Sequence, residues 1–416
     1  MSVVMKDQHE MLAFQKKQLE MFLQRGLPTR KEENWKYTDV SMLSVTPAKT
    51  GIQTEIVGLD ASCSLPSNAF IGGWHDIVFI NGNFSSELSN LKKLPDNITL
   101  MPLSQAFELH SETIKKHFSH EFDVKQHPFA VLNSAHAKEG IFLHVPKNSI
   151  LSSPIKIIYY NNNENVMTSI RNIFILDENA ETTVIEEYIS KDKNTFTNVV
   201  TDIYANNNVK FNHYKIQEEA GAHTGNIFVN QKQDSQINLF NLTKDTSLAR
   251  NDVTIRLAFT GAECHLLGLY LLDEDNQHID NHIHVDHAAQ QGTSSMLYKG
   301  ILNKKSRAVF NGKVHVHQNA QGINAYQANH NLLLSKEAEV NTKPELEIYA
   351  DDVKCAHGAT IGQLDNESIF YLCARGIQKE EAVKILLSAF IHEVLSQIKN
   401  PEVRHYIEKR VAAYDE

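Results

Sequence analysis

The chain has 416 residues, of which 42% are hydrophobic and 22% charged, which is typical of a globular protein with a sizeable core and about two or three domains. Its formal net charge of -10, without a basic stripe, argues against nucleic acid or an anionic membrane as a main partner, because both attract clustered Lys and Arg. The sequence has neither a signal-peptide core nor an apolar run long enough to span a bilayer. We therefore expect a soluble, cytoplasmic protein.

Residues 1–127 are predicted to form a capping domain of helical and mixed structure. Apolar residues within Met5–Arg25 recur with a helical period, and Gly26 ends the pattern. Trp35 and Tyr37 are expected to anchor this region against the rest of the protein, since large aromatic side chains bury much apolar surface.

The second half of this domain is predicted to contain a short strand over Asp76–Ile80 and a helical segment over Leu103–Phe118. Three histidines of the helical segment and its end, His110, His117 and His120, lie among charged residues. We expect them to be solvated rather than to bind a metal.

Residues 128–364 are a succession of short strand-like runs that start about every ten to fifteen residues and are separated by turn-rich breaks. No helical pattern intervenes, which excludes a doubly wound α/β fold and leaves a sandwich, a barrel or a parallel β-helix. Asn161–Asn163 and Asn206–Asn208 fall at predicted turns, where Asn tolerates left-handed backbone and can stack as a ladder. This pattern favours a mainly β protein with a single parallel β-helix core.

Residues 365–416 are predicted to be helical. Asp365 is placed to cap a first helix that Gly376 ends, and a longer helix runs over about Lys379–Lys399. The longer helix carries a wide apolar stripe, which is either buried against its own domain or docks a second protein. The residues of this stripe that we expect to bind a partner are Leu386, Leu387, Phe390, Ile391 and Val394.

The four cysteines, Cys63, Cys264, Cys355 and Cys373, have no CxxC spacing and predict neither a disulfide framework nor a self-contained zinc module. Cys355 and His357 nevertheless lie two residues apart in a strand-like run, so their side chains point to the same face and can share one metal ion. A zinc site needs four ligands and an iron-sulfur cluster prefers several thiolates, so the remaining ligands must come from elsewhere.

Three motifs resemble the SufB/SufD family of the SUF iron-sulfur cluster assembly machinery, and within it the D-type subunits. They are EIYADDVKCAHGATIGQLD at residues 347–365, FYLCARGI at Phe370–Ile377 and GLPTRKEENWKYTDV at Gly26–Val40. The resemblance implies a right-handed parallel β-helix between helical terminal regions, and a noncatalytic scaffold subunit. It further implies two partners: SufB, bound through matching β-helix cores, and the ABC-type ATPase SufC, bound at the C-terminal helices.

In this interpretation Cys355 and His357 lie where SufB docks and donate ligands to iron or to a transient iron-sulfur cluster that SufB completes. The sequence contains no Walker A loop, no nucleophile elbow, no HExxH and no dinucleotide fingerprint, so we expect any ATP hydrolysis to reside in SufC.

A second hypothesis comes from the densest group of histidines, in the run NQHIDNHIHVDHA. His282 and His284 share a strand face, and with His315 or His317 they could bind zinc or iron in a cupin-like metalloenzyme. The alternative is that these side chains only stack and hydrogen-bond along the face of a β-helix. The other acidic and imidazole groups of the run are His278, Asp280, Asp286 and His287.

Overall fold

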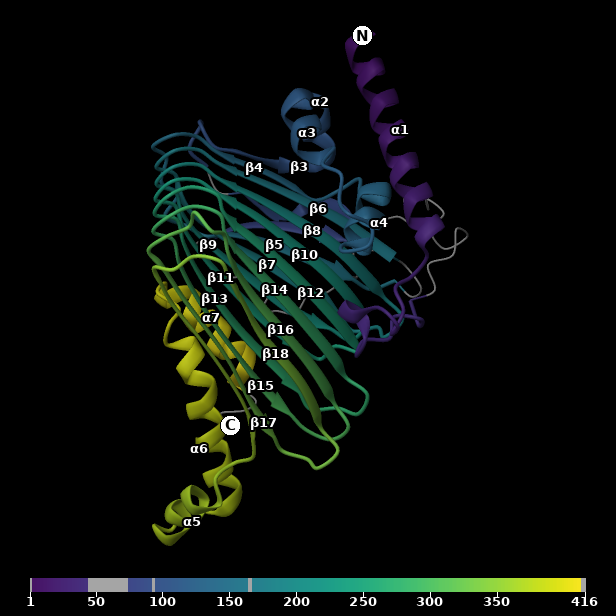
Figure 1. Ribbon diagram of the computed structural model, residues 1–416. Coiled ribbons are helices and arrows are strands. Elements are labelled where there is room, and N and C mark those ends of the chain that lie inside the picture. Colours follow the sequence, from purple (N-terminus) through teal and green to yellow (C-terminus); the bar gives the residue numbers. More distant parts are fainter. Residues whose placement is uncertain (1, 44–73, 92–93, 164–166, 413–416) are drawn as a thin grey trace.

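The computed structural model describes residues 2–43, 74–91, 94–163 and 167–412, with side chains from residue 10 onward. Two large sheets dominate the described chain, and both lie along one coil of about eight turns (Figure 1). From β4 onward, strands of even number lie in one sheet and strands of odd number in the other, so the chain crosses between the sheets after every strand. This arrangement is a parallel β-helix, as the sequence predicts.

We name the ten-stranded sheet A and the nine-stranded sheet B. Sheet A contains, in spatial order, β2 (Asn83–Asn90), β1 (His75–Ile80), β5 (Ile155–Asn161), β7 (Glu181–Ser190), β9 (Lys210–Glu219), β11 (Gln236–Lys244), β13 (Glu263–Leu272), β15 (Thr293–Leu302), β17 (Ile323–Leu333) and β19 (Val353–Gly362). Sheet B contains β3 (Thr99–Pro102), β4 (Ile141–Val145), β6 (Met167–Leu176), β8 (Phe196–Ala205), β10 (Ala222–Gln231), β12 (Leu248–Leu257), β14 (His278–His287), β16 (Arg307–Val316) and β18 (Glu339–Ile348).

Neighbouring strands are parallel and in strict register. Leu248 of β12 lies beside His278 of β14, so one turn of the coil takes 30 residues there. The only antiparallel pairs among the described strands are β1 with β2 and β3 with β4, at the start of the coil. The cupin-like alternative is therefore wrong, because such double-sheet folds are built from antiparallel strands.

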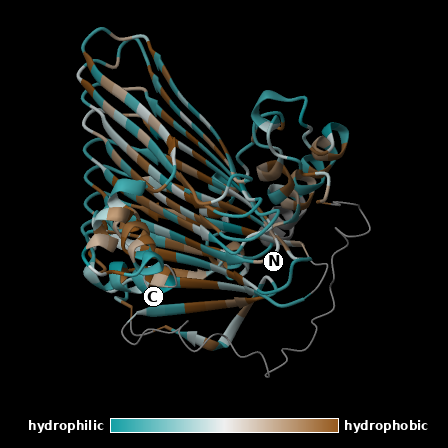
Figure 2. Cartoon of the chain, turned by 90° about the horizontal axis from the view of Figure 1, so that it is seen from below, coloured by the Kyte–Doolittle hydropathy of each residue, from teal (hydrophilic) through white to brown (hydrophobic). Residues whose placement is uncertain are grey.

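Strands form here because apolar and polar residues alternate, and Figure 2 shows this alternation as brown and teal bands along both sheets. The inward-facing residues of both sheets form one core that extends through the coil from Ile77 to Val340. The outer face of sheet A is also apolar around Tyr214, Phe240 and Leu269, where helices cover it. Each turn therefore buries its inner faces between the two sheets and against the turns before and after it.

The corners of the coil use left-handed backbone at equivalent positions in successive turns. Asn148, Asn179 and Asn208 have φ of 60°, 61° and 58°, and Asp234 and Gly261 continue the series with 56° and 74°. The Asn179 Nδ2 donates to the Asn148 Oδ1 at 2.6 Å, so these amides form a ladder along the corner. The predicted turn at Asn206–Asn208 is confirmed.

The N-terminal region packs on the outer face of sheet B. Helix α1 (Ser2–Arg25) lies against α4 (Pro128–His136), and the 3-10 turn η1 (Glu33–Trp35) follows it. Trp35 is buried against Phe129, with ring centroids 5.6 Å apart, which confirms its anchoring role. Tyr37 is exposed, so the same prediction for Tyr37 is wrong.

The predicted helical segment over residues 103–118 is divided into α2 (Leu103–Leu109) and α3 (Ser111–Phe118). The predicted strand over Asp76–Ile80 is confirmed as β1, but it pairs with β5 and thus extends sheet A. The domain boundaries at residues 127/128 and 364/365 stay predictions, although strands from before residue 128 join both sheets.

The C-terminal segment forms α5 (Asn366–Ala374), α6 (Lys379–Leu395) and α7 (Pro401–Val411). Asp365 caps α5 as predicted, because its side chain accepts hydrogen bonds from the backbone N–H groups of Glu367 and Ser368. Helix α6 lies on the outer face of β13 and β15, whereas α5 projects past the lower end of the sheets in Figure 1. No helix in the described part of the chain is both long and apolar enough to cross a bilayer.

Several glycines in the strands allow a large inward-facing side chain of the next turn to approach. A Cβ atom at Gly268 of β13 would lie 2.2 Å from the ring of Tyr298, which faces it from β15. At Gly358 of β19, by contrast, an added Cβ atom would meet nothing within 4 Å. The two positions differ because Gly268 lies in the middle of the coil and Gly358 in its last strand.

We predict that Gly268→Ala lowers the free energy of unfolding by about 1–3 kcal/mol, the usual effect of overpacking a core. Gly358→Ala is the matched control and should be neutral or stabilising by up to about 1 kcal/mol, because it only restricts the unfolded chain. The measurement is the midpoint of urea denaturation of both variants. Equal midpoints would contradict the importance of this close approach.

Candidate functional site

The last turn of the coil has a neighbouring turn on one side only. Strand β19 pairs only with β17, and β18 only with β16, among the described strands. The backbone N–H and C=O groups along these two edges are therefore free to pair with another chain. Side chains at this end are correspondingly exposed, including Ile361 with 47% and Tyr349 with 62% of their surface accessible.

Cys355 and His357 lie on this open edge and continue two inward-facing columns of the coil. Cys355 is the register partner of Ala325, and His357 is the partner of Gln327, both of which are buried inside the preceding turn. Cys355 is half-buried and packs in a small apolar cluster with Ala325 and Leu346. His357 is exposed, because no further turn lies over it. The predicted common orientation of the thiol and the imidazole thus follows from the register.

The environment of Cys355 favours the neutral thiol. Burial raises the pKa of Cys355, although a backbone hydrogen bond involving Ala325 lowers it. Metal binding would have to displace this proton, since the thiolate is the ligand. Among the described residues only one group of three His, Cys, Asp or Glu side chains brings its ligand atoms together, and it includes neither Cys355 nor His357. At this edge the described chain thus offers two potential ligands, Cys355 and His357.

Hydrogen bonds between side chains and backbone groups connect the last turns around these two residues. The Gln327 side-chain Nε2 donates to the Glu345 carbonyl oxygen at 3.1 Å, which ties β17 to β18 under His357. Asp351 and Asp352 are exposed at the bend between β18 and β19, as expected of carboxylates at a turn. The Asp352 backbone N–H donates to the Gln321 Oε1 at 2.9 Å, so this bend is fixed to the preceding corner.

The apolar stripe of α6 packs mostly against the chain's own sheet A. Leu387, Ile391 and Val394 are buried in a cluster that includes Leu269 and Ile301 of the sheet. Leu386 is half-buried, and Phe390 is partly buried against the same cluster. The partner-binding role predicted for these five residues stays a prediction, but three of them have no surface to offer a partner in this conformation.

Phe390 is held in place by Lys299 of β15. The Lys299 Nζ lies 3.8 Å from the centroid of the Phe390 ring and donates to the Phe390 carbonyl oxygen at 3.0 Å. Lys299 also forms an ion pair with Glu393 of α6. These contacts fix α6 on the sheet.

The exposed apolar residues of the C-terminal region lie on α5 and at the start of α6. Phe370 has 74% of its surface accessible, Tyr371 56% and Ile385 39%. The sequence analysis did not assign a role to these residues, although Phe370 and Tyr371 belong to the motif at residues 370–377. The signal available from the sequence was an aromatic residue within a specific motif of a predicted helix. Such a residue indicates a binding surface when the helix leaves it exposed.

The histidine-rich run on β14 is divided between two environments. At its start, Asp280 accepts hydrogen bonds from Thr38 and Arg250, and the Thr38 Oγ1 also lies 2.9 Å from the His278 Nε2. The Arg250 guanidinium lies 4.3 Å from the centroid of the Trp35 ring. These contacts on the outer face of the strand anchor the N-terminal motif to sheet B.

The pKa of Asp280 reflects this anchoring. Burial by itself raises the pKa of Asp280, but Arg250 and His282 lower it well below its usual range. The His282 Nε2 lies 3.0 Å from the Asp280 Oδ1. His282 thus belongs to the anchor, and it does not join His284 in a common metal site as the alternative hypothesis supposed.

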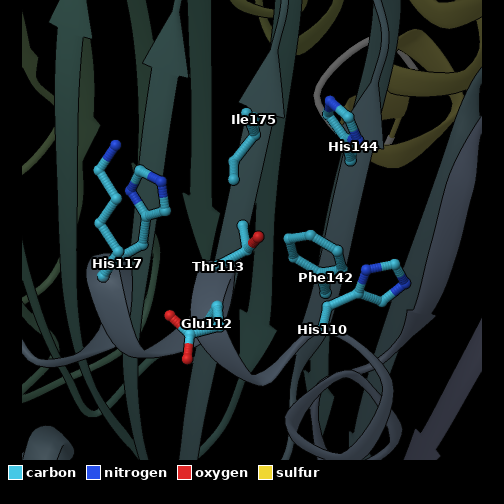
Figure 3. Close-up of a pocket in the computed structure, with 8 residues that line it drawn as sticks. His110, Glu112, Thr113, His117, Phe142, His144 and Ile175 are labelled. Atoms are coloured by element: carbon cyan, nitrogen blue, oxygen red, sulfur yellow. The ribbon is translucent and has the colours of Figure 1, made fainter.

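A hollow of about 470 Å³ lies between α3 and the strands β4 and β6, and it contains two of the histidines that were expected to be solvated. Figure 3 shows His117 on one side of it and His110 and His144 on the other, with Thr113 and Phe142 between them. His117 is half-buried against Tyr204, and burial lowers its pKa. The three imidazoles do not converge on one point, so a shared metal ion does not fit here.

Of the other cysteines, the two that the structure describes lie away from the edge site. Cys264 is buried in the core, which raises its pKa. Cys373 is half-buried on α5, and Cys63 lies outside the described residues. Cys355 is therefore the cysteine among those described that faces the open end.

Comparison with known proteins covers nearly the whole chain. Residues 159–390 match the model of the SufBD core domain of SUF system FeS cluster assembly, and residues 2–157 match that of the SufBD N-terminal region. An iron-sulfur cluster assembly SufBD family protein of Synechocystis is 32% identical over 387 residues, which are 89% of this chain and 84% of that protein. The iron-sulfur cluster assembly protein SufD of Escherichia coli is 28% identical over 94% of this chain and 90% of its own length.

The iron-sulfur cluster assembly protein SufD of Bacillus subtilis is 24% identical over 75% of this chain and 73% of its own length. The core model matches more than half of the chain, and it spans the strands β6 to β19 together with α5 and most of α6. The protein therefore belongs to the SufBD family of iron-sulfur cluster assembly proteins of the SUF system.

Proposed function

We propose that this protein is a noncatalytic, D-type scaffold subunit that pairs with SufB and recruits the ATPase SufC for the assembly and transfer of iron-sulfur clusters. The observation that carries the proposal is the position of Cys355 and His357, on the free edge of a β-helix that belongs to the SufBD family. The likeness to proteins named SufD supports the D-type assignment.

The free edge is suited to a second β-helix. Strands β18 and β19 present unpaired backbone groups, and an added strand from another chain would continue the ladder of either sheet. Pairing of this kind would also cover the exposed side chains of Ile361 and Tyr349. A family member of similar architecture is the partner that would match both sheets at once, and SufB fits this requirement.

Such pairing would complete the ligand set at Cys355 and His357. These residues offer one sulfur and one nitrogen donor, and both continue inward-facing columns at the edge that a further turn would cover. Iron or a nascent cluster at this interface is the cargo of the assembly, and its other ligands would come from SufB. The mixed donor set fits iron, which accepts thiolate and imidazole.

The C-terminal helices are the proposed contact with SufC. Helix α6 is fixed on sheet A by its buried stripe, and it holds α5 away from the sheets. Phe370 and Tyr371 of α5 and Ile385 of α6 have exposed apolar side chains, and we name these three residues the α5 surface. The proposed contact is with the α5 surface, while Leu387, Ile391 and Val394 fix α6 on sheet A.

The first prediction concerns cluster formation on the purified complex of SufB, SufC and this protein. Cys355→Ala and His357→Ala should each reduce the cluster yield by at least about 10-fold, because loss of even an indirect contact to a metal costs that much. The measurement is the visible absorption of the cluster together with iron and sulfide content. Gel filtration should show that both variants still assemble.

Two matched controls accompany these variants. Cys373→Ala removes a half-buried thiol on α5, and His330→Ala removes a half-buried imidazole that faces outward from the neighbouring strand β17, where it contacts Thr360. Both controls should retain the cluster yield of the unmodified complex. Normal yield from Cys355→Ala and His357→Ala in an intact complex would show that these residues do not ligate the cargo.

The second prediction separates docking from folding at the C-terminal helices. Phe370→Asp should abolish capture of SufC while leaving the thermal unfolding temperature unchanged, since Phe370 is exposed. Leu387→Asp should instead lower the stability by several kcal/mol, because it places a charge in the apolar cluster on sheet A. Affinity capture of SufC and thermal unfolding are measured for both variants. Retained capture by Phe370→Asp would remove the α5 surface from the proposal.

A further inference from the structure

Three potential metal ligands converge on the outer face of sheet B, two turns before the open end. Asp286 of β14 lies directly beside His315 of β16 in the register, and His284 precedes Asp286 by two residues on the same face. One ligand atom from each of the three side chains lies within 4.8 Å of the other two. All three residues are half-buried, so they are accessible to an ion from solvent.

The hydrogen bonds around Asp286 indicate what the cluster is built to hold. One carboxylate oxygen, Oδ1, accepts from the His315 Nδ1 at 2.8 Å and from the His317 Nε2 at 2.7 Å. The other oxygen lies 3.8 Å from the Nε of Arg256, whose side chain is 59% exposed and free to turn away. Both imidazole rings thus direct an N–H group at the same carboxylate oxygen. A cation bound between these nitrogen and oxygen atoms would replace the hydrogen-bonding protons.

His284 provides the second observation. Its Nε2 atom is buried and has no hydrogen-bond partner, although an unpaired buried ring nitrogen is unfavourable. The neighbouring cation Lys313 is paired with Glu347 at 2.8 Å. His284 therefore has a ring nitrogen without a protein partner, next to a carboxylate and a second imidazole. This nitrogen is available to bind an ion.

We propose that His284, Asp286 and His315 bind a divalent first-row transition metal ion. Two imidazole nitrogens and one carboxylate oxygen suit Zn²⁺ and Fe²⁺, and three protein ligands leave open positions for water or an incoming donor. The strands hold the three side chains rigidly, because their spacing follows from the register. His317 would remain hydrogen-bonded to Asp286 and orient its carboxylate.

This site is separate from the edge site. Asp286 and His315 point outward from sheet B, whereas Cys355 packs in the inward-facing cluster of the last turn. The inference therefore goes beyond the proposed function and does not depend on it. A metal at the outer site needs no ligand from a second chain.

The test is titration of the purified full-length chain with Co²⁺, followed by its visible absorption, and with Zn²⁺, followed by calorimetry. The experiment uses the Cys355→Ala, His357→Ala double variant as its background, so that the edge site cannot contribute. We expect one ion per chain. His284→Ala, His315→Ala and the isosteric Asp286→Asn should each weaken binding by at least about 10-fold.

The matched control is His282→Ala, which removes an imidazole from the same face of the same strand, two residues from His284. It should leave the affinity unchanged, because His282 contacts Asp280 and not the cluster. Circular dichroism should confirm that every variant is folded. Absence of binding to the background protein, or equal binding by the control and by folded His284→Ala and His315→Ala, would overturn the proposal.

Discussion

In a parallel β-helix each turn is covered along the coil axis only by the turns on either side of it, so side chains at an end of the coil are exposed unless another element covers them. At the start of the coil, the antiparallel strands β2 and β3 are the last strands of the two sheets. At the other end, β18 and β19 are left with free edges in the described chain. The same residue positions that are buried in every earlier turn, such as those of Ala325 and Gln327, become accessible as Cys355 and His357. Exposure of these side chains is thus a consequence of the architecture.

The interior of the coil also contains charged side chains, and these have hydrogen-bonding or oppositely charged partners there. The Glu186 Oε1 lies 3.1 Å from the His213 Nε2, and the Lys215 Nζ donates to the Asn251 Oδ1 at 3.0 Å. Burial lowers the pKa of Lys215 to about 8, although Glu186 raises it. Gly225 makes room for this side chain, since a Cβ atom there would lie 2.1 Å from the Lys215 Nζ. A buried charged pair such as Glu186 and Lys215 adds little net stability, but removing one partner alone is costly. The pair therefore favours the one register of the strands in which both partners meet.

A second buried network attaches the C-terminal helices to sheet A. Arg410 of α7 pairs with Glu187 of β7 and lies 3.1 Å from Glu218 of β9, while the Tyr406 hydroxyl donates to Glu187 at 2.6 Å. Together with Lys299 under α6, these contacts fix both helices on the apolar outer face of the sheet. Fixed helices hold α5 in a defined position beyond the sheets, where its aromatic residues are exposed.

Local patterns in the sequence were sufficient to predict the strands, the left-handed corner at Asn208 and the cap at Asp365, because each depends on residues that are close in the chain. The features that sequence analysis missed depend on contacts between distant segments. The stripe containing Leu387 and Ile391 is equally apolar whether it meets its own sheet or another protein, and only the fold reveals that it covers sheet A.

The histidine-rich strand β14 is a second example, because the sequence does not reveal which distant segments contact its single side chains. A period of two predicts that His282 and His284 share a face, but it does not reveal what lies opposite each of them. Thr38 and Arg250, which are distant in sequence, donate hydrogen bonds to Asp280, and His282 also contacts Asp280. Strand β16 instead brings His315 beside Asp286. Two histidines separated by one residue thus belong to different sites. Because one face of β14 meets different neighbours along its length, a single strand both anchors the N-terminal motif and presents a group of metal-binding side chains.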